Sequence, residues 1–229
     1  MTKEERQQKR EAEAALKAEK QRLKEEAERE RLRGMWNAQK ELSGAARFVF
    51  GIDEAGRGPL CGPVVAACCI LPEDAGILYL NDSKKLSGQK REALYEEIVR
   101  TALAYGIGMT GPERIDEINI LQATYEAMRM AVQKLAVQPE LLLVDAVHIP
   151  DMNIRQVSIV KGDARSQSIA AASIIAKVTR DHLMTAFSDC FPEYDLASNK
   201  GYGTAAHIKA LKEYGPSPIH RQTFIRKFI

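Results

Sequence analysis

Two short apolar runs that end in carboxylates constrain the fold of this chain most strongly. Residues 48–52 run directly into Asp53 and Glu54, and residues 141–144 end in Asp145. Adjacent carboxylates at the end of a buried strand are costly, because like charges repel and each group loses water, unless a cation lies between them. We therefore expect two strands that bring acidic side chains together, and a divalent metal site is the first hypothesis.

A third acid follows another apolar run. Asp163 stands after residues 157–160, within the sequence Lys161-Gly-Asp163. For any one of these acids, a strand-end turn or a helix cap is the simpler interpretation, since Asp favours both places. The turn or cap interpretation is less favoured when three independent apolar runs are all followed by acids. We therefore predict that the acids converge on one site.

The size and cysteine content of the chain limit its class. With 229 residues, 45% hydrophobic and 28% charged, the chain can bury one sizeable core, which predicts a single catalytic domain. The four cysteines show no CxxC spacing, so neither a zinc site nor a disulfide framework is indicated. The longest apolar stretch, residues 64–71, is too short to span a bilayer. We expect a soluble, cytoplasmic protein with reduced thiols.

The first part of the chain differs in composition from the rest. Residues 3–33 are almost entirely Glu, Lys, Arg, Gln and Ala, with no Gly or Pro before Gly34. This predicts a solvated helix, and because the spacing of Leu16 and Leu23 is not continued, a coiled coil is not indicated. The alternative is a basic arm that touches nucleic acid or a partner protein. We divide the chain into a charged extension, 1–46, and a domain, 47–229.

The domain itself carries equal numbers of basic and acidic residues, so its total charge does not indicate a nucleic-acid partner. The distribution of charge does, because cations cluster near the predicted acidic site: Arg57, Lys84, Lys85, Lys161, Arg165, Lys177 and Arg180. Cations that alternate with carboxylates suit a phosphodiester substrate. The alternative is ordinary salt bridging at a sheet edge.

Periodicity along the domain alternates between strand and helix. We expect strands at 48–53, 63–71, 104–110 and 141–145, and helices near 87–104, 119–136, 166–188 and 204–213, with a helical connection starting at Pro112. This order predicts an α/β fold with a mixed sheet flanked by helices. Tyr202 stands between two glycines, which would let a ring project onto a sugar or base; a loop aromatic folded onto the core is the alternative.

Several ordered motifs together resemble the bacterial ribonuclease HII family, over residues 48–229. They are Gly51-Ile-Asp-Glu-Ala-Gly-Arg-Gly58 with Gly62-Pro-Val-Val65, Asn81-Asp-Ser-Lys84, Leu143-Val-Asp145, Lys161-Gly-Asp163, Ala171-Ala-Ser-Ile-Ile-Ala-Lys177, Lys200-Gly-Tyr202 and Pro218-Ile-His-Arg221. The resemblance implies an RNase H-like fold with a mixed five-stranded sheet, and endonucleolytic cleavage of RNA in RNA/DNA hybrids, including single ribonucleotides embedded in duplex DNA.

The resemblance also assigns residues. The family's catalytic and metal-binding acids fall on Asp53, Glu54, Asp145 and Asp163, which implies two Mg²⁺ or Mn²⁺ ions during catalysis and products with 3′-OH and 5′-phosphate ends. Recognition of the 2′-hydroxyl falls on Gly56, Arg57, Gly58 and Tyr202, and we assign phosphate contacts to Lys84, Arg57, Lys177 and Arg180.

Two other classes of function stay open at this point. A metal-dependent phosphatase or a nuclease that acts on DNA would use the same carboxylates, and a non-catalytic hybrid-binding protein would use the same cations. We expect a monomer without membrane contact. The sequence leaves the preferred metal, the partner of the extension and the role of His220 and Arg221 undetermined.

Overall fold

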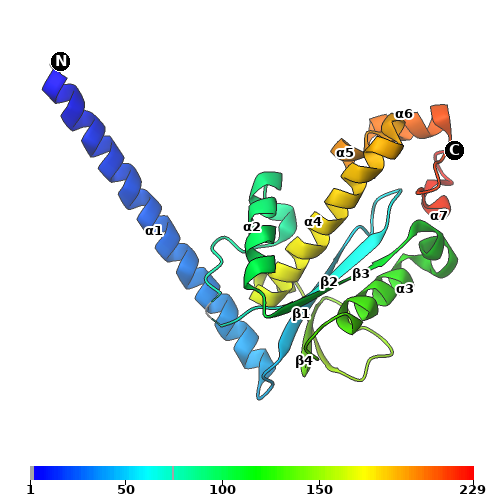
Figure 1. The fold of residues 1–229 in the computed structure, drawn as a ribbon, viewed down its shortest axis with the longest axis horizontal. Helices are drawn as coiled ribbons and strands as arrows, with labels where there is room; N and C mark the ends of the chain where they lie inside the picture. Colours follow the sequence, from blue (N-terminus) through cyan, green and yellow to red (C-terminus); the bar gives the residue numbers. More distant parts are fainter. Residues whose placement is uncertain (1–2, 74) are drawn as a thin grey trace.

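A five-stranded mixed sheet forms the centre of the computed structural model, which describes residues 3–73 and 75–229 (Figure 1). The strands lie in the order β3-β2-β1-β4-β5. They are β1 (Val49–Ala55), β2 (Val64–Ile70), β3 (Ala104–Thr110), β4 (Leu141–Asp145) and β5 (Arg155–Ile159). β2 runs antiparallel to β1 and β3, whereas β4 runs parallel to β1 and β5. The predicted mixed sheet is confirmed.

Helices cover both faces of this sheet. The α-helices are α1 (Lys3–Ser43), α2 (Gly88–Thr101), α3 (Pro112–Gln133), α4 (Gln167–Cys190), α5 (Leu196–Asn199), α6 (Ala205–Tyr214) and α7 (Gln222–Ile225), and the short 3-10 helices are η1 (Ser83–Lys85), η2 (Gly162–Ala164) and η3 (Pro192–Tyr194). α3 packs on one face around Phe50 and Ile52, and α4 packs on the other face with α2 beside it (Figure 1). Two apolar layers therefore sandwich the sheet.

Glycines allow the helices to approach the strands closely. A β-carbon on Gly51 of β1 would lie 2.1 Å from the backbone nitrogen of Ile169 on α4. On the other face, a β-carbon on Gly108 of β3 would lie 2.0 Å from the carbonyl oxygen of Ala127 on α3. Because real β-carbons do not tolerate such contacts, these positions require glycine, and α4 lies directly on the strand that carries Asp53 and Glu54.

The expected elements agree closely with the observed ones. The strands predicted at 104–110 and 141–145 have those bounds, and β1 continues to Ala55, beyond the predicted end at 53. The helical connection at Pro112 and the helix expected from 119 are merged in α3, with a break at Asn119, whose φ of 68° and ψ of 165° are not helical. The Asn119 side chain accepts hydrogen bonds from the backbone of Leu121 and Gln122 and thereby starts the second half of α3.

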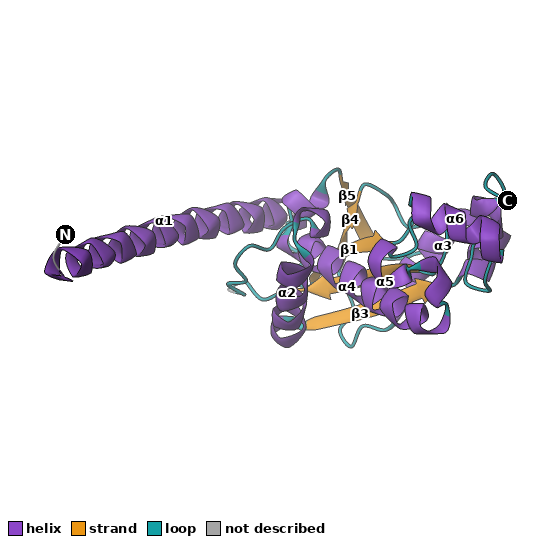
Figure 2. Ribbon diagram, turned by 90° about the horizontal axis from the view of Figure 1, so that it is seen from above, coloured by secondary structure: helices purple, strands orange, loops and turns teal. Residues whose placement is uncertain are grey.

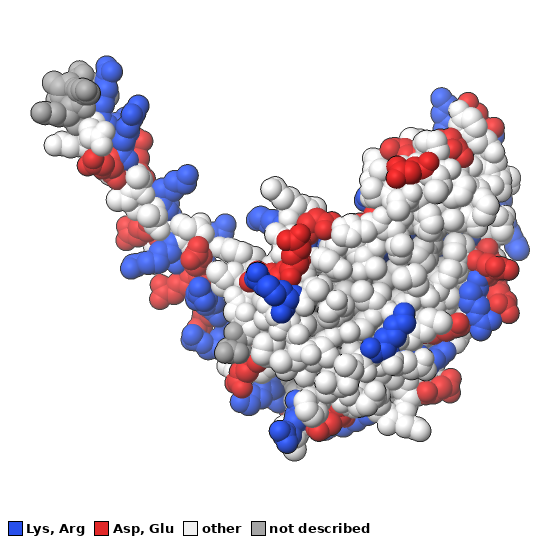
Figure 3. Space-filling view, viewed as in Figure 1, with Lys and Arg blue, Asp and Glu red and all other residues white. Residues whose placement is uncertain are grey.

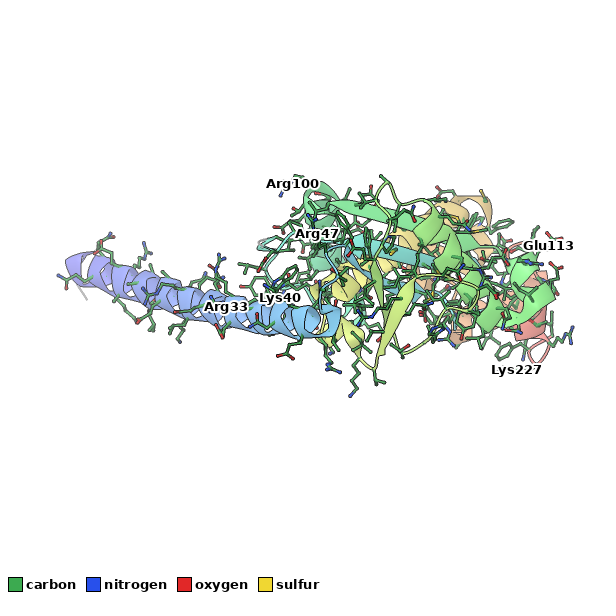
Figure 4. The ribbon with its side chains drawn as sticks, turned by 90° about the horizontal axis from the view of Figure 1, so that it is seen from below. Arg33, Lys40, Arg47, Arg100, Glu113 and Lys227 are labelled. Carbon is green, nitrogen blue, oxygen red and sulfur yellow. The ribbon has the colours of Figure 1, made fainter. Side chains whose placement is uncertain are left out.

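The charged N-terminal helix α1 is 41 residues long, and its first part projects away from the body (Figures 1 and 2). Side chains of both charge signs alternate along this projecting part (Figure 3). The last turns of α1 reach the body, where Figure 4 labels Arg33 and Lys40. There Leu32 and Met35 are buried in the core against α4, so the expected solvated helix describes only the projecting part.

Across the part of the chain that the structure describes, no helix combines the length and the apolar character needed to cross a membrane.

Candidate active site

The first three acids gather at one edge of the sheet because of strand direction. β1 and β4 are parallel neighbours, with Ile52 beside Val144 in the register, so the next residue of each strand is an acid at the same end. Asp53 is 9% exposed, and Glu54 and Asp145 are half-buried. The structure therefore brings together the acids of two strands that are far apart in sequence, as expected for carboxyl ends of parallel strands.

Asp163 reaches the same edge from beyond β5. Lys161 adopts a left-handed conformation, with φ of 55°, and turns the chain into η2. The backbone nitrogen of Gly162 donates a hydrogen bond of 2.8 Å to Oδ1 of Asp145, which ties this turn to the end of β4. Asp163 is half-buried and close enough to Asp145 for their charges to interact. All four predicted acids thus lie in one cluster.

Burial and mutual repulsion make this cluster unfavourable when every carboxylate is ionised. Burial, then the charges of Glu54 and Asp145, raise the pKa of Asp53 well above its usual value. Burial also raises the pKa of Glu54, which the Arg57 guanidinium, 3.3 Å from Oε1, partly offsets. For Asp163, burial and the nearby Asp82 and Asp145 charges raise the pKa. A cation between these groups would remove the repulsion.

The donor set fits a hard divalent cation. Oxygen atoms of carboxylates are the ligands that Mg²⁺ and Mn²⁺ prefer, and four carboxylates converge here with raised pKa values on three of them. Glu54, Asp145 and Asp163 are only partly buried, so the cluster is in contact with solvent. The residues present therefore match the metal site expected from the sequence.

The segment 81–86 lines the site from the other side. Asp82 caps η1 by accepting a hydrogen bond from the Lys84 backbone, and the exposed Lys84 lies near enough to Glu54 to lower its pKa. The buried Ser83 and Ser173 hydroxyls are hydrogen-bonded at 2.8 Å, which holds this segment against α4. The Ser173 hydroxyl also favours the charged form of Asp53. Asp82 and Ser173 were not predicted as site residues, although both stand inside the motifs named above.

Next to the acids, residues 56–62, here called the glycine turn, lie against Tyr202. Gly56 has a φ of 98°, and a β-carbon there would lie 2.2 Å from Nε of Arg180. A β-carbon on Gly58 would lie 3.7 Å from the ring atom Cε1 of Tyr202, which is 47% exposed. The backbone nitrogen of Leu60 donates to the carbonyl of Gly201 at 2.8 Å and joins the two loops. Of the predicted sugar-facing residues, Arg57, Gly58 and Tyr202 are therefore exposed on one surface, whereas Gly56 is buried against Arg180.

The cations assigned to phosphate differ in placement. Arg57 and Lys84 are exposed beside the acids. Lys177 on α4 is half-buried and pairs with Asp181 at 2.6 Å. Arg180 is 1% exposed, so it does not face solvent as a direct phosphate contact would require. Its guanidinium lies behind the glycine turn and donates instead to backbone carbonyls, those of Cys61, Pro63 and Lys200.

A second buried guanidinium, which the sequence did not assign, belongs to Arg221. This residue is 0% exposed and donates five hydrogen bonds to carbonyls of the glycine turn, those of Gly56, Arg57, Pro59 and, twice, Gly62. The only signal in the sequence was its place in the Pro218-Ile-His-Arg221 motif, because no local pattern distinguishes a buried Arg from a surface one.

Comparison with known proteins agrees with this geometry. The family model described as Ribonuclease HII matches residues 50–227 of this chain. A ribonuclease HII of Lachnoclostridium phytofermentans is 66% identical over 180 residues, which cover 79% of this chain and 71% of the relative. A ribonuclease HII of Acetivibrio thermocellus is 52% identical over 214 residues, or 93% of this chain and 84% of the relative.

Solved structures share the fold. The ribonuclease H2 of Pyrococcus horikoshii OT3 superposes with a TM-score of 0.65 at 28% identity, covering 80% of this chain and 97% of that one. The RNase HII in a complex with PCNA from Archaeoglobus fulgidus gives a TM-score of 0.64 at 28% identity, covering 77% of this chain and 94% of that chain. The predicted RNase H-like fold is confirmed. Four acids at one sheet edge, the matched family model and these relatives lead to one conclusion: this chain belongs to the ribonuclease HII family and is a ribonuclease H endonuclease that acts on RNA/DNA hybrids.

Proposed function

We propose that this endonuclease also nicks duplex DNA on the 5′ side of single embedded ribonucleotides, using two divalent metal ions held by Asp53, Glu54, Asp145 and Asp163. The observation that carries the proposal is the position of the acid cluster directly beside the glycine turn and Tyr202. A catalytic edge and a surface suited to a sugar thus adjoin each other. When bound, Mg²⁺ or Mn²⁺ ions would activate the attacking water and stabilise the departing 3′ oxygen.

The four acids supply the charge that holds the ions, and the strands of the sheet carry three of them, Asp53, Glu54 and Asp145. Asp53 and Asp145 are fixed by adjoining strands, and Asp145 is held further by the Gly162 amide. Arg57 and Lys84, exposed at the rim, are suited to bind the phosphates that flank the cleaved bond. Hydrolysis by activated water leaves 3′-OH and 5′-phosphate ends, and no protein nucleophile takes part.

The glycine turn and Tyr202 are the proposed sensor of the ribose. The exposed Gly58 has no side chain and lets backbone groups of the turn approach the 2′-hydroxyl, which is the group that distinguishes RNA from DNA locally, while the buried Gly56, with φ of 98°, gives the turn its shape against Arg180. The exposed Tyr202 ring, which lies against Gly58, is placed to stack on the neighbouring sugar. This adjacency favours a ribose sensor over a general DNA nuclease, which has no need of one.

A single experiment tests the proposal. A labelled DNA duplex with one embedded ribonucleotide is incubated with the protein and Mg²⁺, with Mn²⁺, or with EDTA, beside an all-DNA duplex and a uniform RNA/DNA hybrid. We expect metal-dependent nicking on the 5′ side of the ribonucleotide, with the all-DNA duplex untouched. Cleavage of the all-DNA duplex would show a general nuclease. Cleavage of the uniform hybrid alone would restrict the activity to long RNA tracts.

A further inference from the structure

The segment 217–221 near the C-terminus lies beneath both parts of the proposed ribose sensor. Its backbone pairs with the glycine turn, since Gly62 donates to the carbonyl of Ile219 at 2.8 Å and Arg221 donates to that of Leu60 at 2.9 Å. A bridge between Cys61 and His220 lies between these two hydrogen bonds. The short strand-like pairing places the side chains of two consecutive residues, His220 and Arg221, under the sensor.

Arg221 holds the glycine turn. Its five N–H groups all donate to carbonyl oxygens of the turn, at distances from 2.6 to 3.0 Å. Burial lowers the pKa of this guanidinium to about 9, and no salt bridge to it exists among residues 3–73 and 75–229. A buried cation whose hydrogen bonds all go to backbone carbonyls fixes the direction of each peptide unit that it contacts. The shape of the turn therefore depends on Arg221.

His220 reaches Tyr202 through a second histidine. Nδ1 of His220 accepts a hydrogen bond from the Ser217 backbone nitrogen at 3.0 Å, so the proton of the neutral ring is on Nε2. That Nε2 lies 3.0 Å from Nε2 of His207 and donates to it. His207 then carries its proton on Nδ1, which donates to the carbonyl of Tyr202 at 2.9 Å. One consistent pair of tautomers satisfies the whole chain of hydrogen bonds.

A metal site is the alternative use of this cluster. The ligand atoms of Cys61, His207 and His220 lie within 4.8 Å of one another. Both imidazoles are, however, already engaged on both nitrogens, and Arg180 and Arg221 each donate to carbonyls around Cys61, at Cys61 itself and at Gly62. Burial raises the pKa of the Cys61 thiol to about 12, so the thiolate that a soft cation needs is disfavoured. The chain of hydrogen bonds is the better supported role.

We propose that His220 and Arg221 are positioning residues for ribose recognition: Arg221 sets the glycine turn, and His220 sets the Tyr202 loop through His207. The inference rests on the proposed function, because it assigns a task to residues that act through that sensor. It gives one short segment control over the relative placement of the two halves of the sensor. Neither side chain touches substrate, since both are buried.

The test of His220 uses two substitutions. His220→Gln keeps an N–H donor near the position of Nε2, whereas His220→Leu fills similar space without a donor. For His220→Leu we expect kcat on the single-ribonucleotide duplex to fall by about 10- to 100-fold, with little change in duplex Kd, because a misplaced contact group costs rate. His220→Gln should recover most of that loss. The exposed His182 on α4 supplies the matched control, His182→Leu.

Combination with Tyr202→Ala decides whether His220 acts through the tyrosine. If it does, His220→Leu lowers kcat no further in the Tyr202→Ala background. The inference would be overturned if the fold-loss of kcat in the double variant were the product of the two single losses, with circular dichroism showing that each variant is folded. Equal losses of kcat in His220→Leu and His220→Gln would also overturn it. A Tyr202→Ala variant that nicks like the wild type would instead refute the proposed sensor, so the two failures are distinguishable.

Arg221→Lys tests the other half of the proposal. Lysine keeps the charge but replaces a planar fork of five donors by a flexible ammonium group with three. We expect kcat on the single-ribonucleotide duplex to fall by about 10-fold while duplex Kd stays near the wild-type value. The exposed Arg226 provides the control, Arg226→Lys. Unchanged kcat in a folded Arg221→Lys variant would overturn the role of Arg221, and parallel losses of kcat and binding would show a general structural role.

Discussion

The Ser166 hydroxyl at the start of α4 donates a hydrogen bond of 2.7 Å to Oε1 of Gln39 on α1. The same Gln39 donates through Nε2 to the Ser168 hydroxyl at 3.2 Å. Both partners are buried, so the amide satisfies polar groups that would otherwise lack a partner in the core. The last turns of α1 are thus part of the structure that supports α4, although their composition is that of a charged extension.

Leu32→Ala is expected to destabilise the protein, because it weakens the packing of α1 against α4. Leu32 is 5% exposed and packs in the core beside α4, so truncation should lower the free energy of unfolding by about 2–4 kcal/mol. Leu16 on the projecting part is 53% exposed, and Leu16→Ala should change it by less than about 0.5 kcal/mol. Denaturant unfolding of both variants measures the difference. Equal, small effects would mean that α1 does not stabilise the body.

Asp53→Asn should stabilise the metal-free protein while it abolishes cleavage. The pKa of Asp53 is raised in the folded state, so the fold favours the protonated carboxyl and loses stability as pH rises from the unfolded value through the folded one. At pH 7.5 an amide removes the cost of burying this charge beside other acids, and Tm should rise by about 2–4 °C for each kcal/mol of that cost removed.

Thermal unfolding with EDTA and with Mg²⁺ checks the Asp53 prediction. Added metal should raise the Tm of the wild type and raise that of Asp53→Asn much less, because one ligand is missing. Asp189→Asn, at an exposed position of α4, is the control and should respond to metal like the wild type. A lower Tm for metal-free Asp53→Asn would instead show that the carboxylate stabilises the fold.

Stability should depend on pH through His220. Burial, then the charge of His207, lowers the pKa of His220 to about 4. A His with a lowered pKa stabilises the fold above its unfolded value near 6.5, and this contribution is lost as pH falls toward 4. Between pH 7 and pH 5 the loss amounts to about 2 kcal/mol. Urea unfolding of the wild type and of His220→Gln at both pH values tests this. Between pH 7 and pH 5 the free energy of unfolding should fall by about 2 kcal/mol more in the wild type than in His220→Gln, and an equal fall in both would contradict the assignment.

Gly51→Ala should be far more damaging than the same change in the exposed α1 helix. A methyl group at Gly51 would lie 2.1 Å from the backbone of Ile169, so β1 or α4 would have to move. We expect a loss of at least about 3 kcal/mol or failure to fold. At Gly34 nothing lies within 4 Å, and Gly34→Ala should stabilise α1 by about 0.5–1 kcal/mol. Thermal melts of the two variants provide the comparison.

Much of the fold and of the acidic site was predictable because the signals are local. An apolar run followed by an acid indicates where a strand ends, and the parallel pairing of β1 with β4 then brings Asp53 and Asp145 together. The break at Asn119 likewise follows from a short polar side chain that can cap a helix. In each case a few neighbouring residues determine the result.

The parts that sequence alone did not give depend on packing between distant segments. Arg180 is followed on α4 by Asp181 and His182, yet its side chain turns inward, where it donates hydrogen bonds to the carbonyls of Cys61, Pro63 and Lys200. His207 and His220 meet only because residues 217–221 pair with that turn. The burial of Leu32 and Met35 requires the position of α4, which the composition of α1 does not indicate.

β1 ends at Ala55, and the glycine turn begins at the next residue, Gly56. Two of the acids proposed to cut, Asp53 and Glu54, are therefore separated from the proposed sensor turn by a short length of one backbone. That length sets the distance along the substrate strand between the ribose that is recognised and the phosphate that is attacked. We expect the insertion of a single residue in this link to shift the cut along the strand.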